Sequence, residues 1–237
     1  MNVASKKRWC LVGTLFYIYY VIRNYIPFSY ENVFAGVDYN GQTLFYASTL
    51  YLFGIIIFYG FGNTEKYIEG YGILELIRSV KRGLVIRKII IDQIKNIFQI
   101  ITFIIVIFLL FAFLAGKKGE LVPAEKLISD IGLFYIVAFS IVLWQSIFEI
   151  VFDSRIGILL TMSIIGIHIY AGDFIAAHDG NTYLNLVFYS NLALTARTDR
   201  LSISKSWMFV VVVSICVIQM ILMNLVFRKK DIFSSSE

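Results

Sequence analysis

The residues of this sequence that could do chemistry are few, and most of them interrupt long apolar runs. The polar side chains inside these runs are Gln145, Glu149, His168, Gln219 and Asn224. Such groups usually face a partner or a water-filled path, although Gln and Asn also serve as hydrogen-bonding groups between helices. We expect the first four to line an internal path, with helix packing as the alternative for the neutral residues. For Glu149 the alternative is a pairing with Arg155 or with a basic loop residue.

Motifs for nucleotide, metal or disulfide chemistry are absent from the sequence. No Gly-x-x-x-x-Gly-Lys-Ser/Thr run occurs, so if ATP drives this protein, another chain must bind it. With two histidines and no His-Glu-x-x-His motif, we expect no metal site. Cys10 and Cys216 both lie inside apolar runs, which favours ordinary buried thiols over a disulfide framework. We therefore expect a protein that is not an enzyme and has no cofactor of its own.

One arrangement is weakly similar to the intramembrane Abi/CAAX-type proteases. Phe174-x-x-x-His178 accompanies Glu149 and Arg155, but those proteases need a Glu-Glu-x-x-x-Arg run and a second helical His motif on a neighbouring span. This sequence has Glu149 alone, and the topology expected below puts His178 on the opposite side of the membrane from it. An intramembrane protease is therefore only the third hypothesis for the function, behind the two given at the end of this section.

The elements that must position these residues are membrane helices. Of 237 residues, 59% are hydrophobic and only 16% are charged, against roughly a quarter in ordinary soluble domains. The charges cluster between long apolar runs, as in a polytopic membrane protein. At about 20 residues per crossing, the length allows five or six helices and leaves no room for an appended soluble domain.

We predict an all-α integral membrane protein with one domain, residues 1–237, and six spans. Backbone polar groups find no partners in lipid, so these apolar runs should be helical. The predicted spans are 9–29, 42–62, 97–116, 131–152, 156–177 and 206–227. The first begins like a signal peptide, after Lys6, Lys7 and Arg8, but no small-residue cleavage pattern follows it, so we take it as an uncleaved span.

The distribution of basic residues predicts the orientation. With the N-terminus inside, fourteen Lys and Arg fall on the cytoplasmic side and seven outside, which obeys the positive-inside rule. An even number of spans then puts both termini in the cytoplasm. We expect a multi-pass protein of the cell membrane, namely a bacterial plasma membrane. Its partners would include membrane lipid and no nucleic acid.

Residues 65–95, between spans two and three, are too charged to cross a membrane but carry a helical pattern. Ile73, Ile77, Val80 and Leu84 recur at spacings of four, three and four. This predicts a short amphipathic helix at the cytoplasmic surface. Glycines break the chain on both sides of it, at positions 70, 72 and 83. The alternative for such a basic segment, taken by itself, is that it only attracts anionic lipid and fixes the topology.

In position, spacing and sequence, this segment resembles the first cytoplasmic loop of the ABC-2 family of ATP-binding-cassette transporter permeases. There an acidic, Gly-containing stretch leads into a short Leu-Glu-rich helix, followed by basic residues and a Lys at the start of span three. The matching residues are Glu69, Gly70, Ile73, Leu74, Glu75, Leu76, Ile77, Arg82 and Lys88. The Pro that usually follows the helix is missing, since Val80 or Lys81 stands there.

The resemblance covers the whole chain in architecture and residues 65–88 in sequence, and it implies a transporter subunit. In that family the loop helix docks on a separate ATPase subunit that binds the ATP. The coupling residues would be Gly72, Leu74, Glu75, Ile77, Arg78, Lys81 and Arg82, and the four polar residues named first would line the translocation path. A second permease copy, or a related permease, would complete that path.

The family also has short re-entrant helices on the outer side before span six. Here that region is 180–205, which is too apolar for a solvated loop. An interfacial helix in the aromatic belt is the equal alternative.

Our leading hypothesis is an ABC exporter permease that moves an amphipathic or hydrophobic substrate, such as a peptide, an antibiotic or a lipid-linked molecule. The rival is a stand-alone membrane immunity or sensor-associated protein that acts without ATP.

Overall fold

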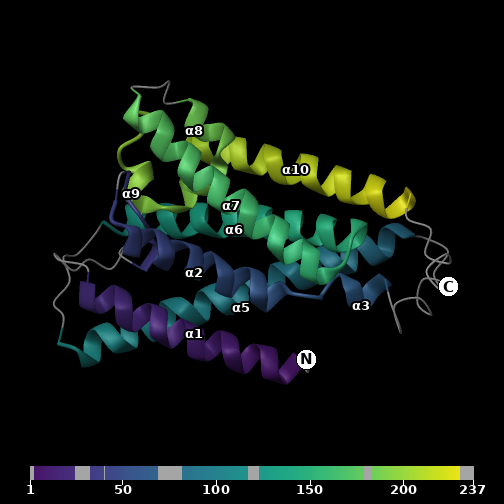
Figure 1. Ribbon diagram of the computed structural model, residues 1–237, viewed down its shortest axis with the longest axis horizontal. Coiled ribbons are helices and arrows are strands. Elements are labelled where there is room, and N and C mark those ends of the chain that lie inside the picture. The colour runs from purple at the N-terminus through teal and green to yellow at the C-terminus, as the bar shows by residue number, and fades with distance from the viewer. Residues whose placement is uncertain are drawn as a thin grey trace.

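The computed structural model describes residues 3–24, 33–39, 41–68, 82–116, 123–178 and 183–229. Within these ranges the chain forms helices and turns and no strand. In chain order the elements are α1 (Val3–Asn24), α2 (Thr43–Gly60), α3 (Glu65–Ile68), α5 (Arg82–Leu114), α6 (Ala124–Val151), α7 (Ser154–Ala177), α8 (Leu184–Val187), the 3-10 helix η2 (Tyr189–Ala193), α9 (Thr195–Thr198) and α10 (Lys205–Lys229) (Figure 1).

Among the described residues, five helical segments are long and apolar enough to cross a membrane. They are Thr43–Ile68, Gly83–Leu114, Ala124–Val151, Ser154–Ala177 and Lys205–Lys229. The chain is thus an all-helical, multi-pass membrane protein. The expected first span is not among the five: α1 begins earlier than predicted, and its 22 residues include four basic side chains. Residues 25–29 of the predicted span lie outside the described residues.

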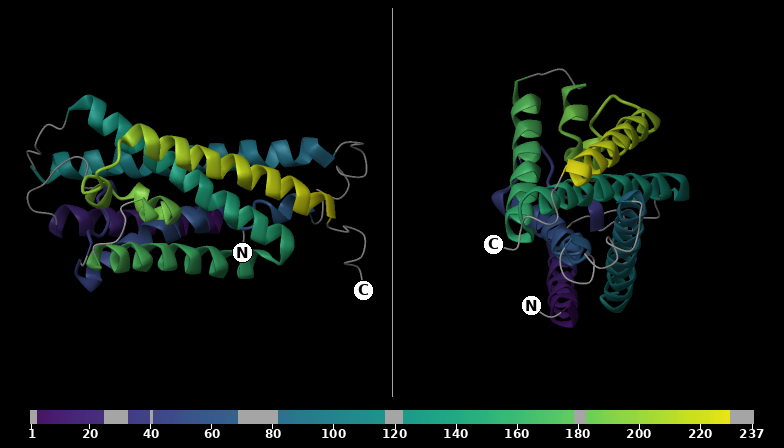
Figure 2. Two further views of the ribbon diagram at one scale, coloured as in Figure 1. Left: turned by 90° about the horizontal axis from the view of Figure 1, so that it is seen from above. Right: turned by 90° about the vertical axis from the view of Figure 1, so that its right-hand side faces the viewer.

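The long helices lie side by side, with α6 at the centre of the bundle (Figures 1 and 2). It packs against α2, α5, α7, α10 and η2, and side chains on all its faces are buried. The bundle has two ends, named here by the short helices that they hold. The α3 end holds α3, the junction of α6 and α7, and the last turn of α10. The α9 end holds α8, η2, α9 and the first turn of α10.

The third long helix differs most from its prediction. We expected residues up to 95 to form a cytoplasmic segment and a span from 97, but α5 is one helix from Arg82. Val85, Ile86 and Ile89 are buried against α3, α6 and α10. The basic pair Arg87 and Lys88 is exposed between them, so charges that interrupt the apolar run do not interrupt the helix.

The coupling segment lies largely outside the described residues. This holds for Gly72, Leu74, Glu75, Ile77, Arg78 and Lys81, whereas Arg82 is the first residue of α5. Gly83, predicted to end the amphipathic helix, instead lies in the first turn of α5. The predicted surface helix itself stays a prediction.

The segment before the last long helix turns into the bundle. Its three short helices, α8, η2 and α9, lie at the α9 end, and η2 packs against α6 and α7. All five residues of η2 are buried. Tyr183, Leu184 and Val187 at the start of the segment are exposed, so only its second half enters the core.

Candidate functional site

Arg197 is the largest side chain that is fully buried in the described part of the chain. It lies in α9, and its guanidinium donates hydrogen bonds in several directions. The Nε group donates to the carbonyl of Val37 at 2.8 Å, and Nη1 donates to the carbonyl of Ile169 at 2.9 Å. Nη1 also donates to Asn191 Oδ1 at 2.7 Å, and Nη2 forms an ion pair with Asp173 Oδ1 at 2.9 Å. The cation is therefore both neutralised and hydrogen-bonded.

The acceptors of Arg197 are themselves held by other segments. The Tyr46 hydroxyl of α2 donates to the second oxygen of Asp173, and Asn191 Nδ2 donates to the carbonyl of His168 at 2.7 Å. The Tyr39 ring lies 4.9 Å from the guanidinium carbon, within the range of a cation–π contact. Burial raises the pKa of the Tyr39 hydroxyl, so this ring stays neutral. The Arg197 cluster thus joins α2, α7, η2, α9 and the segment at 33–39.

The backbone of α7 approaches the side chains of this cluster closely at a glycine. A Cβ on Gly172 of α7 would lie 2.6 Å from Asn191 Nδ2 and 2.9 Å from Arg197 Nη1. Both distances are shorter than any ordinary contact. Glycine at this position is therefore what lets α7 lie against the polar side chains of η2 and α9.

Glu149 organises a second buried cluster at the α3 end. Its side chain is in α6, and only 2% of the residue is exposed. One carboxylate oxygen accepts the backbone N–H of Gly62 at 2.9 Å and the amide of Gln145 at 3.0 Å, and the other accepts the N–H of Thr64 at 3.2 Å. Gly62 has φ +65°, a left-handed conformation that glycine adopts without strain. Glu149 therefore fixes the turn between α2 and α3.

The Glu149 cluster extends to α5 and α7. Gln93 of α5 donates to the Ser146 hydroxyl at 3.1 Å, and a Cβ on Gly157 of α7 would lie 3.1 Å from Glu149 Cγ. The alternative pairing of Glu149 with Arg155 is not among the interactions of the described residues. Arg155 is exposed at the start of α7.

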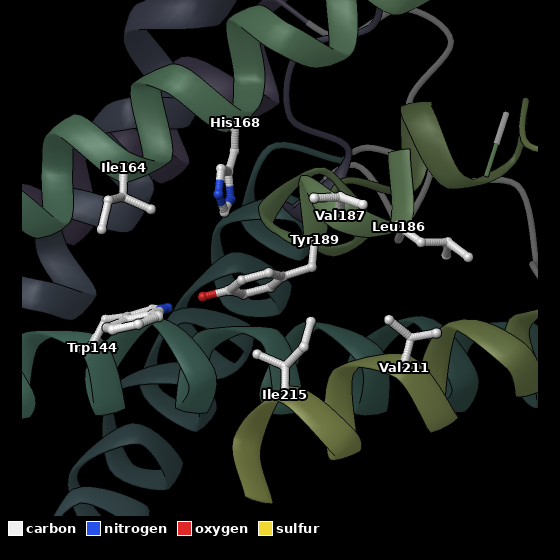
Figure 3. A pocket seen from close by; sticks show the side chains of 8 residues that line it. All are labelled: Trp144, Ile164, His168, Leu186, Val187, Tyr189, Val211 and Ile215. Carbon is white, nitrogen blue, oxygen red and sulfur yellow. The ribbon is translucent and has the colours of Figure 1, made fainter. Parts of the chain in front are cut away.

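A pocket opens between α7 and α10, with α6 as its floor and the segment 186–189 at its side. Its volume is about 540 Å³, and eight residues line it: Trp144, Ile164, His168, Leu186, Val187, Tyr189, Val211 and Ile215 (Figure 3). Figure 3 shows the His168 ring extending from α7 toward Tyr189, and the Tyr189 hydroxyl directed toward Trp144. The pocket is apolar except for these ring groups.

The polar groups of the pocket are oriented by buried neighbours. His168 Nδ1 and the Ser190 hydroxyl are 2.9 Å apart and share a hydrogen bond. The Tyr189 hydroxyl accepts from Gln219 Nε2 at 3.4 Å, and the Ser140 hydroxyl donates to Gln219 Oε1 at 2.9 Å. Two of the predicted path residues, His168 and Gln219, thus meet around Tyr189.

The structure divides the four predicted path residues between two places. Gln145 and Glu149 belong to the cluster at the α3 end, where they bond each other and the turn at 61–64. His168 and Gln219 lie at or behind the pocket. Their role in a path stays a prediction.

Sequence reasoning missed Arg197 and Asp173. Both signals were present: an acidic residue near the end of an apolar run, and a basic residue within a segment too apolar for a solvated loop. A charge pair between them follows from the cost of burying either one alone.

The structure does not bring together the residues of the weak similarity to intramembrane proteases. His178 ends α7 at the α9 end, where its Nδ1 bonds the carbonyl of Phe174 at 2.9 Å. Glu149 and Arg155 lie at the other end of the same bundle. No group of three or more His, Cys, Asp or Glu side chains suited to a metal ion occurs in the described ranges.

Comparison with known proteins gives a family. No curated protein and no solved structure matches the chain significantly. A family model described as a protein of unknown function, DUF2705, matches residues 8–233. Since this match covers nearly the whole length, the chain belongs to the DUF2705 family.

Proposed function

We propose that the protein is the membrane-spanning subunit of an ABC exporter, driven by a separate cytoplasmic ATPase subunit. The observation that carries this proposal is the segment 184–198, three short helices that turn into the bundle directly before the last long helix. Short re-entrant helices at this place are what the resemblance of residues 65–88 to ABC-2 permeases implies. Two observations far apart in the sequence thus favour the same family.

The proposed orientation places the α3 end in the cytoplasm and the α9 end outside. It counts α1 as a further span, in addition to the five long helices. It rests on the excess of Lys and Arg on the α3 side. Cysteines introduced at Ser79 and Ser235 should react only with reagent added from the cytoplasm, and one at Asn181 only from outside. Labelling at Ser79 from outside would refute this orientation.

In this mechanism the chain transmits force and leaves the chemistry to the ATPase. The coupling residues between α3 and α5 would sit on the ATPase, whose closure pushes both helices. The first turns of α5 share a buried apolar cluster with α6 and α10, which includes Ile89, Ile147 and Phe227, so a push there reaches the central helix. On the other side, the turn after α2 is tied to α6 by Glu149. The substrate would be an amphipathic or hydrophobic molecule, and a second permease copy would complete its path.

The test of this function uses charge reversal in the coupling segment. Glu75→Lys and Arg78→Glu should insert and fold normally, because exposed substitutions usually change stability by less than about 0.5 kcal/mol. Both should lose ATPase binding, since a desolvated ion pair broken at an interface costs about 2–5 kcal/mol. Replacing Leu74 and Ile77 by Asp should have the same effect.

The matched control is Lys81→Arg, which keeps the charge and should keep binding. The measurements are co-purification with the ATPase and ATP turnover in liposomes. Wild-type association in all variants would favour the stand-alone immunity or sensor-associated protein. Crosslinking in native membranes should give a dimer, and an active monomer would contradict the proposal.

A further inference from the structure

The pocket between α7 and α10 has the properties of a binding site for a small molecule. Its volume of about 540 Å³ falls within the range of ligand sites, about 300–1,000 Å³. None of the eight lining residues is Asp, Glu, Lys or Arg. A charged group placed inside would find no counterion on the pocket wall, and burying an unpaired charge is costly.

The surroundings of the pocket show how a guest would reach it. Ile167 on α7 and Val210 on α10 flank the lining residues on the outer faces of these two long helices, and both are exposed. Val187 of α8, which lines the pocket, is exposed as well. The entrance is therefore surrounded by the apolar surface that faces lipid, and a guest enters sideways from the bilayer.

His168 brings a hydrogen-bonding ring to this apolar space, beside the Tyr189 hydroxyl that Gln219 holds. His168 Nδ1 is engaged by Ser190, and no described residue is hydrogen-bonded to Nε2. His168 lies well inside α7, nine residues before the last residue of that helix, which is about 14 Å at 1.5 Å per residue. A lipid head group at the membrane surface does not reach this depth. The ring therefore suits a polar atom carried within an apolar molecule.

We propose that this pocket binds a neutral, largely apolar molecule with one hydrogen-bonding group, as in a long-chain alcohol, and that His168 bonds that group. Trp144, Val211 and Ile215 pack against its apolar body. Binding itself needs no ATPase; that the guest is the exported substrate rests on the proposed function. The class excludes molecules whose charged group must enter the pocket.

The test uses the fluorescence of Trp144, which lines the pocket. The chain has three tryptophans, so Trp9→Phe with Trp207→Phe leaves Trp144 as the only one. Bromine quenches tryptophan at short range. The probes are three molecules of the same chain length, each brominated along its chain: an alcohol, an alkane and a trimethylammonium amphiphile. Each is titrated into nanodiscs that hold the protein.

Saturable quenching by the alcohol is expected. Val211→Phe, which fills the pocket, should raise the half-saturating concentration at least tenfold, while Val213→Phe, an exposed position on the opposite side of the same helix, should leave it unchanged. His168→Phe should make the alcohol bind no better than the alkane. The ammonium probe should bind at least tenfold more weakly than the alcohol.

Several results would overturn the proposal. Quenching that rises without saturation, equally in Val211→Phe, would mean ordinary contact with bulk lipid. Absence of quenching would mean that the face is covered, for example by a second copy of the chain. Equal binding of the ammonium probe would refute the chemical class. Ile164→Phe serves as a second filled variant if Val211→Phe does not fold, and circular dichroism checks each one. ATPase association in the same variants tests the proposed function separately.

Discussion

The two buried clusters of this protein solve opposite electrostatic problems. At the α9 end a buried cation, Arg197, is neutralised by Asp173 and donates to backbone and side-chain oxygens from segments up to 160 residues away. At the α3 end a buried anion, Glu149, has no cation among its described partners. It accepts instead from the backbone N–H groups of one turn and from Gln145, four residues before it.

The two ends of the bundle therefore differ in the substitutions that they can tolerate. The Arg197 cluster joins segments that local structure does not connect, so losing its central side chain releases η2, α9 and the segment at 33–39 together. The Glu149 cluster fixes one turn between neighbouring helices. Hence we expect a larger loss of stability from changes at the α9 end than from equivalent changes at the α3 end.

Arg197→Leu should have the largest effect. Removal of one partner from a buried ion pair costs about 3–5 kcal/mol, because the other charge stays buried without compensation. Here Asp173 would lose the cation that neutralises it, while the hydrogen bond from the Tyr46 hydroxyl would stay. Thermal unfolding of the purified protein in detergent, followed by circular dichroism, measures the loss.

A double variant shows whether charge is the reason. Adding Asp173→Asn to Arg197→Leu removes the negative charge that Arg197 no longer neutralises, and it should recover part of the lost stability. If the double variant is as unstable as the sum of the two single ones, the ion pair does not account for the effect, and packing of the side chain does.

Glu149→Ala should cost less than Arg197→Leu. It orphans the N–H groups of Gly62 and Thr64, and a buried donor without a partner costs about 1–3 kcal/mol. The same substitution removes a buried carboxylate that no described cation neutralises, and relief of its desolvation offsets part of this cost, so the loss should fall toward the low side. The measurement is again thermal unfolding. A loss equal to that of Arg197→Leu would contradict the contrast between the two ends.

The sequence predicts the long helices well and their ends less well. The predicted spans at 42–62, 131–152, 156–177 and 206–227 each overlap a long helix almost completely, because largely apolar runs of this length have no alternative in lipid. For α5 the apolar pattern continues through Val85, Ile86 and Ile89, but the charges between them concealed it. A helix continues past charges that it can place on its exposed face.

The buried clusters could be predicted only in part. Glu149 and Gln145 stand four residues apart on one helix, so their meeting follows from helical geometry. The contact of Arg197 with Val37 depends on how two loops fold over the α9 end, and no local pattern encodes it. For the same reason Tyr189 of the pocket carried no signal of its own, beyond lying in a segment too apolar for a loop.

Gly172→Ala tests the close packing at the α9 end. The new Cβ would collide with Asn191 and Arg197, and overpacking of this kind costs about 1–3 kcal/mol. Gly166→Ala on the same helix is the matched control, since no atom lies within 4 Å of its added Cβ. It should be neutral or slightly stabilising, because alanine favours helix by up to about 1 kcal/mol over glycine. Equal unfolding temperatures for the two variants would mean that α7 does not approach η2 and α9 as closely as described.

The smallest effect should come from an ion pair at the same end that solvent reaches. Lys126 lies 2.7 Å from Asp199, with about a third of each side chain exposed. Exposed pairs contribute about 0–1 kcal/mol, so Lys126→Ala should hardly change the unfolding temperature, and added salt should abolish any change.

Lys205→Ala is the informative companion, because its partner Asp130 has a side chain only 2% exposed and would be left buried without its cation. It should therefore lose clearly more stability than Lys126→Ala, with a loss that salt does not remove. If the two lysine variants proved equally mild, burial of the partner would not set the strength of charge pairs at the α9 end, and the large loss expected for Arg197→Leu would have no electrostatic basis.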